Sequence, residues 1–413
     1  MGSTRLRYGL LSLALALAWL VQSCQPTSNR HFDPTVVDFN VSYNPLYEGN
    51  LYPSLILGLS HRQTPDDTVA TLFSMSLTAP VNNAVIRIVI DSSALNYVTI
   101  IQEVLPHRGE RYTLTPNIKW KYDKLYGTRQ GGMIDLTFTC YVNDEEVDIK
   151  NLRLNYRSVN ECLLAAHYNG QAIDFKWLFA GYVDEDHPYI DEILANTLSQ
   201  GVVKRFSGYQ KGTVKPEEQV FAIWNYVLSR GISYSSISCT SNPSRTVRVQ
   251  HIRFFDEVYN TRQANCIDAC VFFASILRKI GIKPVIFVEP CHAYLGYYLD
   301  RDRKKLALLE TTITSWVQFP MLERYLDDQG HLPADRFNRL KDYLTEKEQN
   351  DYQNGLMSFE ELKMAVSRAL FEKARQYNRE SYEANKAAFA DPMNTDYQQL
   401  DIEQLRQLVQ PIH

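Results

Sequence analysis

The hydrophobic pattern of this chain changes its period near Asp174, and that change limits the folds it can adopt. From about Leu51 to Leu163, short runs such as "AVIRIVID" and "IDLTFTCYV" are rich in β-branched and aromatic residues, and turn-forming residues lie between these runs. After residue 174, apolar residues recur at helical spacing, as in "PEEQVFAIWNYVLSR". We therefore predict an α+β protein whose N-terminal part is an antiparallel β-sandwich.

At 413 residues the chain is too long for one ordinary domain. In the last part, Ser358 and Glu361 are spaced as a capping box at a helix start, and an apolar stripe follows them. The predicted organisation is a linker over 25–45, a β-sandwich over 46–168, a domain with a helix packed on an antiparallel sheet over 169–325, and a helical C-terminal region over 326–413.

The first 24 residues are typical of a lipoprotein signal peptide. Two arginines precede an apolar run from Leu10 to Val21, which is too short to span a membrane comfortably. The run leads into "LVQSC", which resembles the lipobox of bacterial lipoproteins except that Gln22 stands where a small residue is usual. In a lipobox the cysteine becomes the lipidated first residue. We therefore predict an exported protein, in the periplasm or on the cell surface, that a lipid on Cys24 tethers to the membrane.

A lipid on Cys24 is directly testable. We expect mass spectrometry of the membrane fraction to find a mature chain that begins at Cys24 and has two or three acyl chains on it. A mature chain that is released in soluble form and begins at another residue would contradict this prediction.

Charge and cysteine spacing argue against several other classes of protein. The net charge is only −4 and the sequence has no basic stripe, so we expect no nucleic-acid partner. Export places the cysteines in an oxidising compartment, where disulfides are permitted. Their spacing is irregular and has no paired CxxC pattern, so the sequence assigns no disulfide framework, and we predict no zinc site. The sequence has no calcium loop or nucleotide motif, and we expect no metal and no cofactor.

The stretch "QANCIDACVFF", residues 263–273, places a cysteine at the start of a helix. Asn265 suits the N-cap, and Asp268 puts a negative charge in the first turn, where the helix dipole favours it. Cys266 then lies in that first turn, where free amides and the positive end of the dipole lower the pKa of a thiol and favour the thiolate. The alternative is a small residue that fills the core, a role that suits Cys270 better.

A nucleophilic thiol needs a nearby base, and His292 follows Cys266 by 26 residues. The predicted strands after the helix are Val285–Glu289, His292–Leu299 and Lys304–Thr311. Two acids, Asp300 and Glu310, could orient the histidine. If the second and third strands form a hairpin centred near Arg301, His292 and Glu310 lie opposite each other on one face, with Cβ atoms about 5 Å apart. Asp300 would lie in the turn, so we predict Glu310 as the acid.

This order of elements resembles the transglutaminase-like superfamily, whose fold is a variant of the papain-like one. The resemblance covers about residues 170–320. It rests on a cysteine that heads a helix ending in "LRKIGI", a histidine that begins the next strand but one, and an acid before a threonine on the following strand. The family's usual acid is the Asp of a "DPT"-like run, where this chain has Glu310-Thr311-Thr312. Cys291 precedes the histidine, where close relatives would be expected to have glycine.

The resemblance implies acyl chemistry at an amide. Cys266 would attack the carbonyl, His292 would transfer the proton, and Glu310 would hold the imidazole in the productive tautomer. The amide of Cys266 would help to bind the oxyanion. Gln263 could add a side-chain donor, but a polar loop residue is the favoured interpretation of it. The expected activity is acyl transfer or hydrolysis on a protein or peptide, of which cell-wall peptide is one case. The alternative is a binding module on the cell envelope that keeps the fold without turnover.

Overall fold

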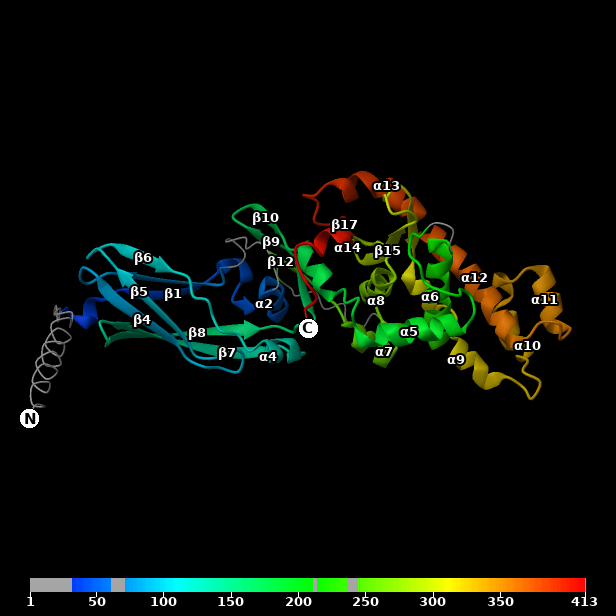
Figure 1. Cartoon of the computed structure of the whole chain (residues 1–413), viewed down its shortest axis with the longest axis horizontal. Helices are drawn as coiled ribbons and strands as arrows, with labels where there is room; N and C mark the ends of the chain where they lie inside the picture. The colour runs from blue at the N-terminus through cyan, green and yellow to red at the C-terminus, as the bar shows by residue number, and fades with distance from the viewer. Residues whose placement is uncertain (1–31, 61–70, 211–213, 236–243, 245, 413) are drawn as a thin grey trace, which may run out of the picture.

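The computed structural model describes residues 32–60, 71–210, 214–235, 244 and 246–412. The chain is mixed α/β, with several sheets and a helical C-terminal region, as predicted at this coarse level. Figure 1 shows an elongated molecule with the N-terminal sheets at one end and the C-terminal helices at the other. The predicted signal peptide and Cys24 lie outside the described residues. Within those residues, no helix is both long enough and apolar enough to span a bilayer.

Two sheets form the N-terminal part. One has the order β1 (Phe39–Tyr43), β3 (Phe73–Thr78), β6 (Arg111–Leu114), and the other has the order β2 (Asn50–Leu51), β8 (Glu145–Tyr156), β7 (Gly132–Val142), β4 (Ala84–Ile90), β5 (Thr99–Leu105). All neighbouring strands are antiparallel except β2 and β8. The rings of Phe73 on β3 and Phe138 on β7 are 6.0 Å apart, so apolar side chains fill the space between the sheets.

The structure differs from the prediction for this part in three respects. β1 lies inside the segment predicted to be a linker, because the short "FNVSY" run buries Phe39 and pairs with β3. The short helices α2 (Pro53–Ser60) and α4 (Tyr122–Gly127) lie in the segment that is predicted to form strands. The boundary at residue 168 divides a hairpin of β9 (Glu161–Tyr168) and β10 (Gln171–Asp174), which with β12 (Val247–His251) forms a third sheet in the middle of the molecule (Figure 1).

The following part contains the helices and the sheet around Cys266. The helices are α5 (Pro188–Ser199), α6 (Pro216–Arg230), α7 (Phe255–Thr261) and α8 (Cys266–Lys279). The antiparallel sheet has the order β16 (Leu306–Leu309), β15 (His292–Tyr298), β14 (Pro284–Glu289), β17 (Gln398–Asp401), and β11 (Ser233–Tyr234) pairs separately with β13 (Gln263–Ala264). The three strands predicted after the Cys266 helix are therefore present, and α8 packs on two of them, β14 and β15.

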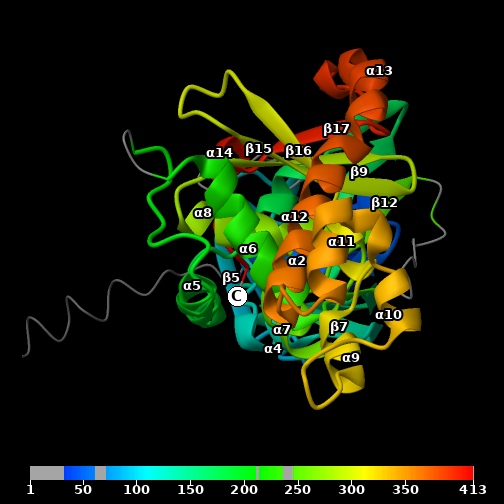
Figure 2. The same cartoon turned by 90° about the vertical axis from the view of Figure 1, so that its right-hand side faces the viewer.

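The C-terminal region is mainly helical but contributes one strand. After α9 (Phe319–Leu322), the helices of this region are α10 (Ala334–Asn338), α11 (Glu346–Gln353), α12 (Phe359–Tyr377), α13 (Arg379–Ala390) and α14 (Ile402–Leu405). The predicted capping box of Ser358 and Glu361 begins α12, which packs on α6 and β16. Figure 2 shows α10, α11 and α12 together on one side of the molecule. β17 pairs with β14, so this region completes the sheet that holds His292.

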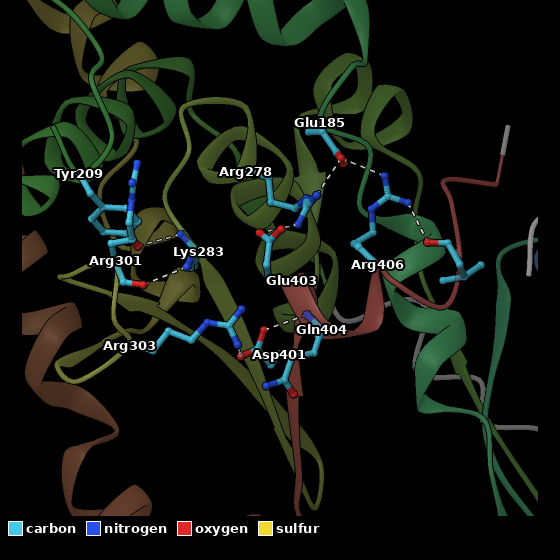
Figure 3. A network of polar contacts seen from close by, with 11 residues as sticks. Glu185, Tyr209, Arg278, Lys283, Arg301, Arg303, Asp401, Glu403, Gln404 and Arg406 are labelled. Carbon is cyan, nitrogen blue, oxygen red and sulfur yellow. Dashed lines mark hydrogen bonds and ion pairs between the residues drawn. The ribbon is translucent and has the colours of Figure 1, made fainter. Parts of the chain in front are cut away.

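A network of ion pairs fixes the last part of the chain to the body of the molecule (Figure 3). Glu185 binds Arg278 of α8 at 3.0 Å and Arg406 at 2.9 Å, both through Oε1. Arg303, in the loop between β15 and β16, binds Asp401 of β17 at 2.9 Å. Arg303 and Asp401 are both largely buried, so removing either would leave the charge of the other without its partner. The network therefore holds β17 at the edge of the sheet.

Candidate active site

The start of α8 positions Cys266. Asn265 Oδ1 accepts a hydrogen bond from the Asp268 amide at 2.9 Å, and Asp268 Oδ2 accepts one from the Asn265 amide at 3.0 Å. This capping box confirms the predicted N-cap and places partly buried Cys266 at the first helical position. Cys270 is fully buried, and burial raises the pKa of its thiol well above the ordinary value. Only Cys266 of the two is placed to react.

His292 and Glu310 are in direct contact. His292 is the first residue of β15, and its Nε2 lies 2.7 Å from Glu310 Oε2. The predicted register was wrong by two residues, since Leu295 pairs with Leu309 and an extension of β16 would place Glu310 opposite Tyr294. A shift of two residues leaves every side chain on the same face. β16 ends at Leu309, and Glu310 instead caps a short 3₁₀ helix, Thr311–Ser315, from where its side chain reaches His292.

Glu310 is buried, with 1% of its surface exposed, and is surrounded by donors. Its Oε1 accepts from the Thr312 amide at 3.0 Å and from the Thr312 hydroxyl at 2.6 Å, while Oε2 accepts from Asn378 Nδ2 at 2.6 Å. Burial alone would raise the pKa of Glu310, but the hydrogen bond and charge of His292 and the donors of Thr312 and Asn378 lower it below the ordinary value. Glu310 is therefore a carboxylate at neutral pH.

The environment of His292 favours its protonated form. Burial alone would lower the pKa of His292, but hydrogen bonds with Cys266 and Glu310, together with the charge of Glu310, raise it to about 10. Because Glu310 occupies Nε2, the other ring nitrogen, Nδ1, is left for Cys266. A protonated imidazole beside a thiol favours the thiolate, which is the reactive form. The three predicted residues thus form one linked set.

A groove of about 440 Å³ contains both Cys266 and His292. One wall comes from β12, and the other comes from the turn between β14 and β15. In that turn Pro290 precedes Cys291, which has φ 66°. Proline followed by a residue with positive φ is the pattern of a type II turn, where glycine is favoured at the second position. Cys291 therefore occupies the place where the family resemblance led us to expect glycine, and it is exposed at the groove.

The other sequence candidates lie elsewhere. Asp300 is in the loop between β15 and β16, as predicted, where it accepts hydrogen bonds from the Lys304 and Lys305 amides at 2.9 and 2.8 Å. A larger hollow of about 700 Å³ lies beside Asp300 and contains none of the three linked residues. Gln263 is an exposed residue of β13 and is not part of the groove lining, so its predicted role as an oxyanion donor has no support in the geometry.

Two features of the site were missed in the sequence. Asn378 lies 68 residues from Glu310 and reaches it only because α12 packs on β16, and no local pattern marks it. The β12 wall of the groove was missed because a five-residue strand between loops gives a weak periodic signal. In the described residues, no cluster of His, Cys, Asp and Glu side chains is arranged to hold a metal ion.

No family model matches the chain, and no curated protein matches it. The inferences on function below therefore rest on the residues and contacts of the chain itself.

Proposed function

We propose that this protein is a transglutaminase-like thiol enzyme that forms an acyl-enzyme at an amide of a protein or peptide. The observation behind the proposal is the buried Glu310 carboxylate, which is bonded to His292 in the groove that also contains Cys266. A thiol at a helix start, a histidine and an orienting acid are the parts that thiol acyl transfer requires. The packing of α8 on an antiparallel sheet is compatible with the family resemblance in the sequence.

The proposed reaction has two steps. In the first, Cys266 Sγ attacks the amide carbonyl carbon, His292 gives its proton to the leaving nitrogen, the C–N bond breaks, and a thioester forms. In the second, an amine or water attacks the thioester, gives its proton to His292, and releases Cys266. The free amides at the start of α8 are placed to stabilise the oxyanion in both steps. Acyl transfer and hydrolysis differ only in the nucleophile of the second step.

The N-terminus supports a location for this activity. The charged start, the apolar run and "LVQSC" favour an exported protein that is anchored to the membrane through Cys24. A tethered enzyme would act on peptides or proteins of the cell envelope, of which cell-wall peptide is one case. This placement is part of the proposal.

Selective alkylation of Cys266 tests the proposal. The purified protein is treated with iodoacetamide at about pH 6, where an ordinary thiol is almost fully protonated. Peptide mapping then gives the rate of modification of each cysteine. We expect Cys266 to react about 100-fold faster than the others, because His292 is placed beside its thiol as the base that a nucleophilic cysteine requires.

Cys291 is the internal control for this experiment. It is an exposed free cysteine in the same groove, so it is more accessible than Cys266, but in the described structure its thiol makes no hydrogen bond with His292 or Glu310. Equal, slow modification of Cys266 and Cys291 would sink the proposal and favour the alternative of a binding module without turnover.

A further inference from the structure

The groove beside Cys266 follows a strand edge that pairs with no other strand in the described residues. β12 is the last strand of the sheet β10-β9-β12, and the four consecutive residues 247–250 all line the groove. One face of a strand would present only every second residue, because side chains alternate between the two faces. A consecutive run therefore means that the edge of β12, with its main-chain groups, borders the groove.

The pairing of β12 with β9 shows which main-chain groups face outward. The His167 amide donates to the Thr246 carbonyl and the Ile252 amide donates to the Asn160 carbonyl, each at 2.8 Å. Bonded and outward-facing residues alternate along an antiparallel strand, so the even-numbered residues of β12 bond to β9. The register shifts after Arg248, but the extra residue lies on β9, so the alternation along β12 is unbroken.

Val247, Val249 and His251 therefore direct their main-chain groups away from β9. The Val247 amide donates to Ser244 Oγ at 2.8 Å, and the His251 carbonyl accepts from Gln250 Nε2 at 3.0 Å. By the same alternation, the N–H and C=O of Val249 do not bond to β9, and no turn, loop or side-chain hydrogen bond reaches them in the described part of the chain. Such a pair on a strand edge is a template for one further strand.

We propose that the substrate is an extended polypeptide segment that binds as an added strand on β12, with Val249 as its main-chain anchor. This inference rests on the proposed function, because it places the amide of that segment beside Cys266. On the side of the β14–β15 turn, the groove is lined by Val288, Ala293 and Cys291 together with Glu289 and His292, so it can contact both apolar and polar peptide side chains. Strand addition uses main-chain hydrogen bonds for affinity and so accepts many sequences. The substrate class is therefore flexible or unfolded peptide rather than a folded surface.

Val249→Pro tests the anchor, and because the Val249 side chain is buried, a control that also shortens this side chain is needed. Proline removes the outward N–H of Val249, and the ladder to β9 does not use that group. Val249→Ala is the matched control, because it shortens the side chain but keeps the N–H. Two probes of Cys266 are compared on the full-length protein. One is chloroacetamide, and the other is a pool of random-sequence hexapeptides with a chloroacetyl group on a central ornithine side chain.

We expect the peptide pool to modify Cys266 about 10-fold faster than chloroacetamide in the wild type and in Val249→Ala. Val249→Pro should abolish this advantage while it leaves the chloroacetamide rate unchanged. If Val249→Pro lowers the chloroacetamide rate as well, its fold is impaired, and a pool with N-methylated backbones decides the question on the wild type. The methylated pool should lose the advantage.

Two results would overturn the inference, and both differ from a failure of the proposed function. One is an equal advantage of the peptide pool in Val249→Pro and Val249→Ala. The other is a wild type in which the normal pool gives no advantage or the methylated pool keeps it. In either case chloroacetamide still modifies Cys266 ahead of Cys291. Slow, equal modification of these two cysteines by chloroacetamide would instead remove the proposed function itself.

Discussion

Glu310→Gln should slow the alkylation of Cys266 at about pH 6 by roughly 100-fold, and turnover by up to about 10⁴-fold. Glutamine keeps the shape of the side chain but removes the charge that stabilises protonated His292. It also places an amide nitrogen among the donors of Thr312 and Asn378, which now need acceptors. The rate of Cys266 modification by iodoacetamide, measured across pH, gives the effect directly.

Asp300→Asn is the matched control for Glu310→Gln. Asp300 is the other acid near His292 in sequence, and it lies in an exposed loop where it accepts hydrogen bonds from backbone amides. Its replacement should change the free energy of unfolding by no more than about 0.5 kcal/mol and should leave Cys266 alkylation unchanged. If Asp300→Asn is the impaired variant, the assignment of Glu310 as the orienting acid is wrong.

The contact between His292 and Glu310 could be predicted from the sequence because it depends on local rules. The capping pair of Asn265 and Asp268 fixes where the Cys266 helix begins. The hairpin register predicted for Glu310 is wrong by two residues, yet the side chains of His292 and Glu310 are still in contact. A register shift by an even number of residues leaves each side chain on the same face of the sheet. The prediction therefore required only that His292 and Glu310 share a face, not that they pair directly.

Contacts that depend on packing between distant segments could not be predicted in this way. Asn378 completes the set of donors to Glu310 because the end of α12 packs against the sheet, and nothing near residue 378 in the sequence indicates this. β17 is a four-residue strand inside a helical region, and β1 lies in a polar segment that is predicted to be a linker. Such short strands are stabilised by their neighbours, so their own sequence gives little signal.

The turn before His292 is an intermediate case. The sequence showed Cys291 where relatives would be expected to have glycine, and the structure gives the reason, a positive φ at that residue. Pro290 in front of it was a usable signal, because proline is common at the first central position of a type II turn. The turn and its strained backbone could therefore have been predicted from "EPCH" alone.

His292→Ala should lower the free energy of unfolding by about 3 kcal/mol at a pH near 6.5. The variant leaves the buried Glu310 carboxylate without its cationic partner, and breaking a buried ion pair costs more than losing an exposed one. Urea denaturation of both proteins measures the difference. His107→Ala is the control, because His107 is exposed and its side chain has no hydrogen bond in the described structure, so a change of no more than about 0.5 kcal/mol is expected.

The decrease in the free energy of unfolding caused by His292→Ala should become smaller as the pH rises. The pKa of His292 is raised from 6.5 to about 10, so its stabilising effect is complete below 6.5 and is lost as the pH rises through about 10. The difference in the free energy of unfolding between the wild type and His292→Ala should therefore decrease from neutral pH upward. In a Glu310→Gln background the same substitution should cost much less, because no buried charge is left unpaired. Two results would mean that His292 and Glu310 are not coupled as a charged pair. One is a difference in the free energy of unfolding that stays constant up to about pH 10. The other is an equal loss of stability from His292→Ala in the wild-type and the Glu310→Gln protein.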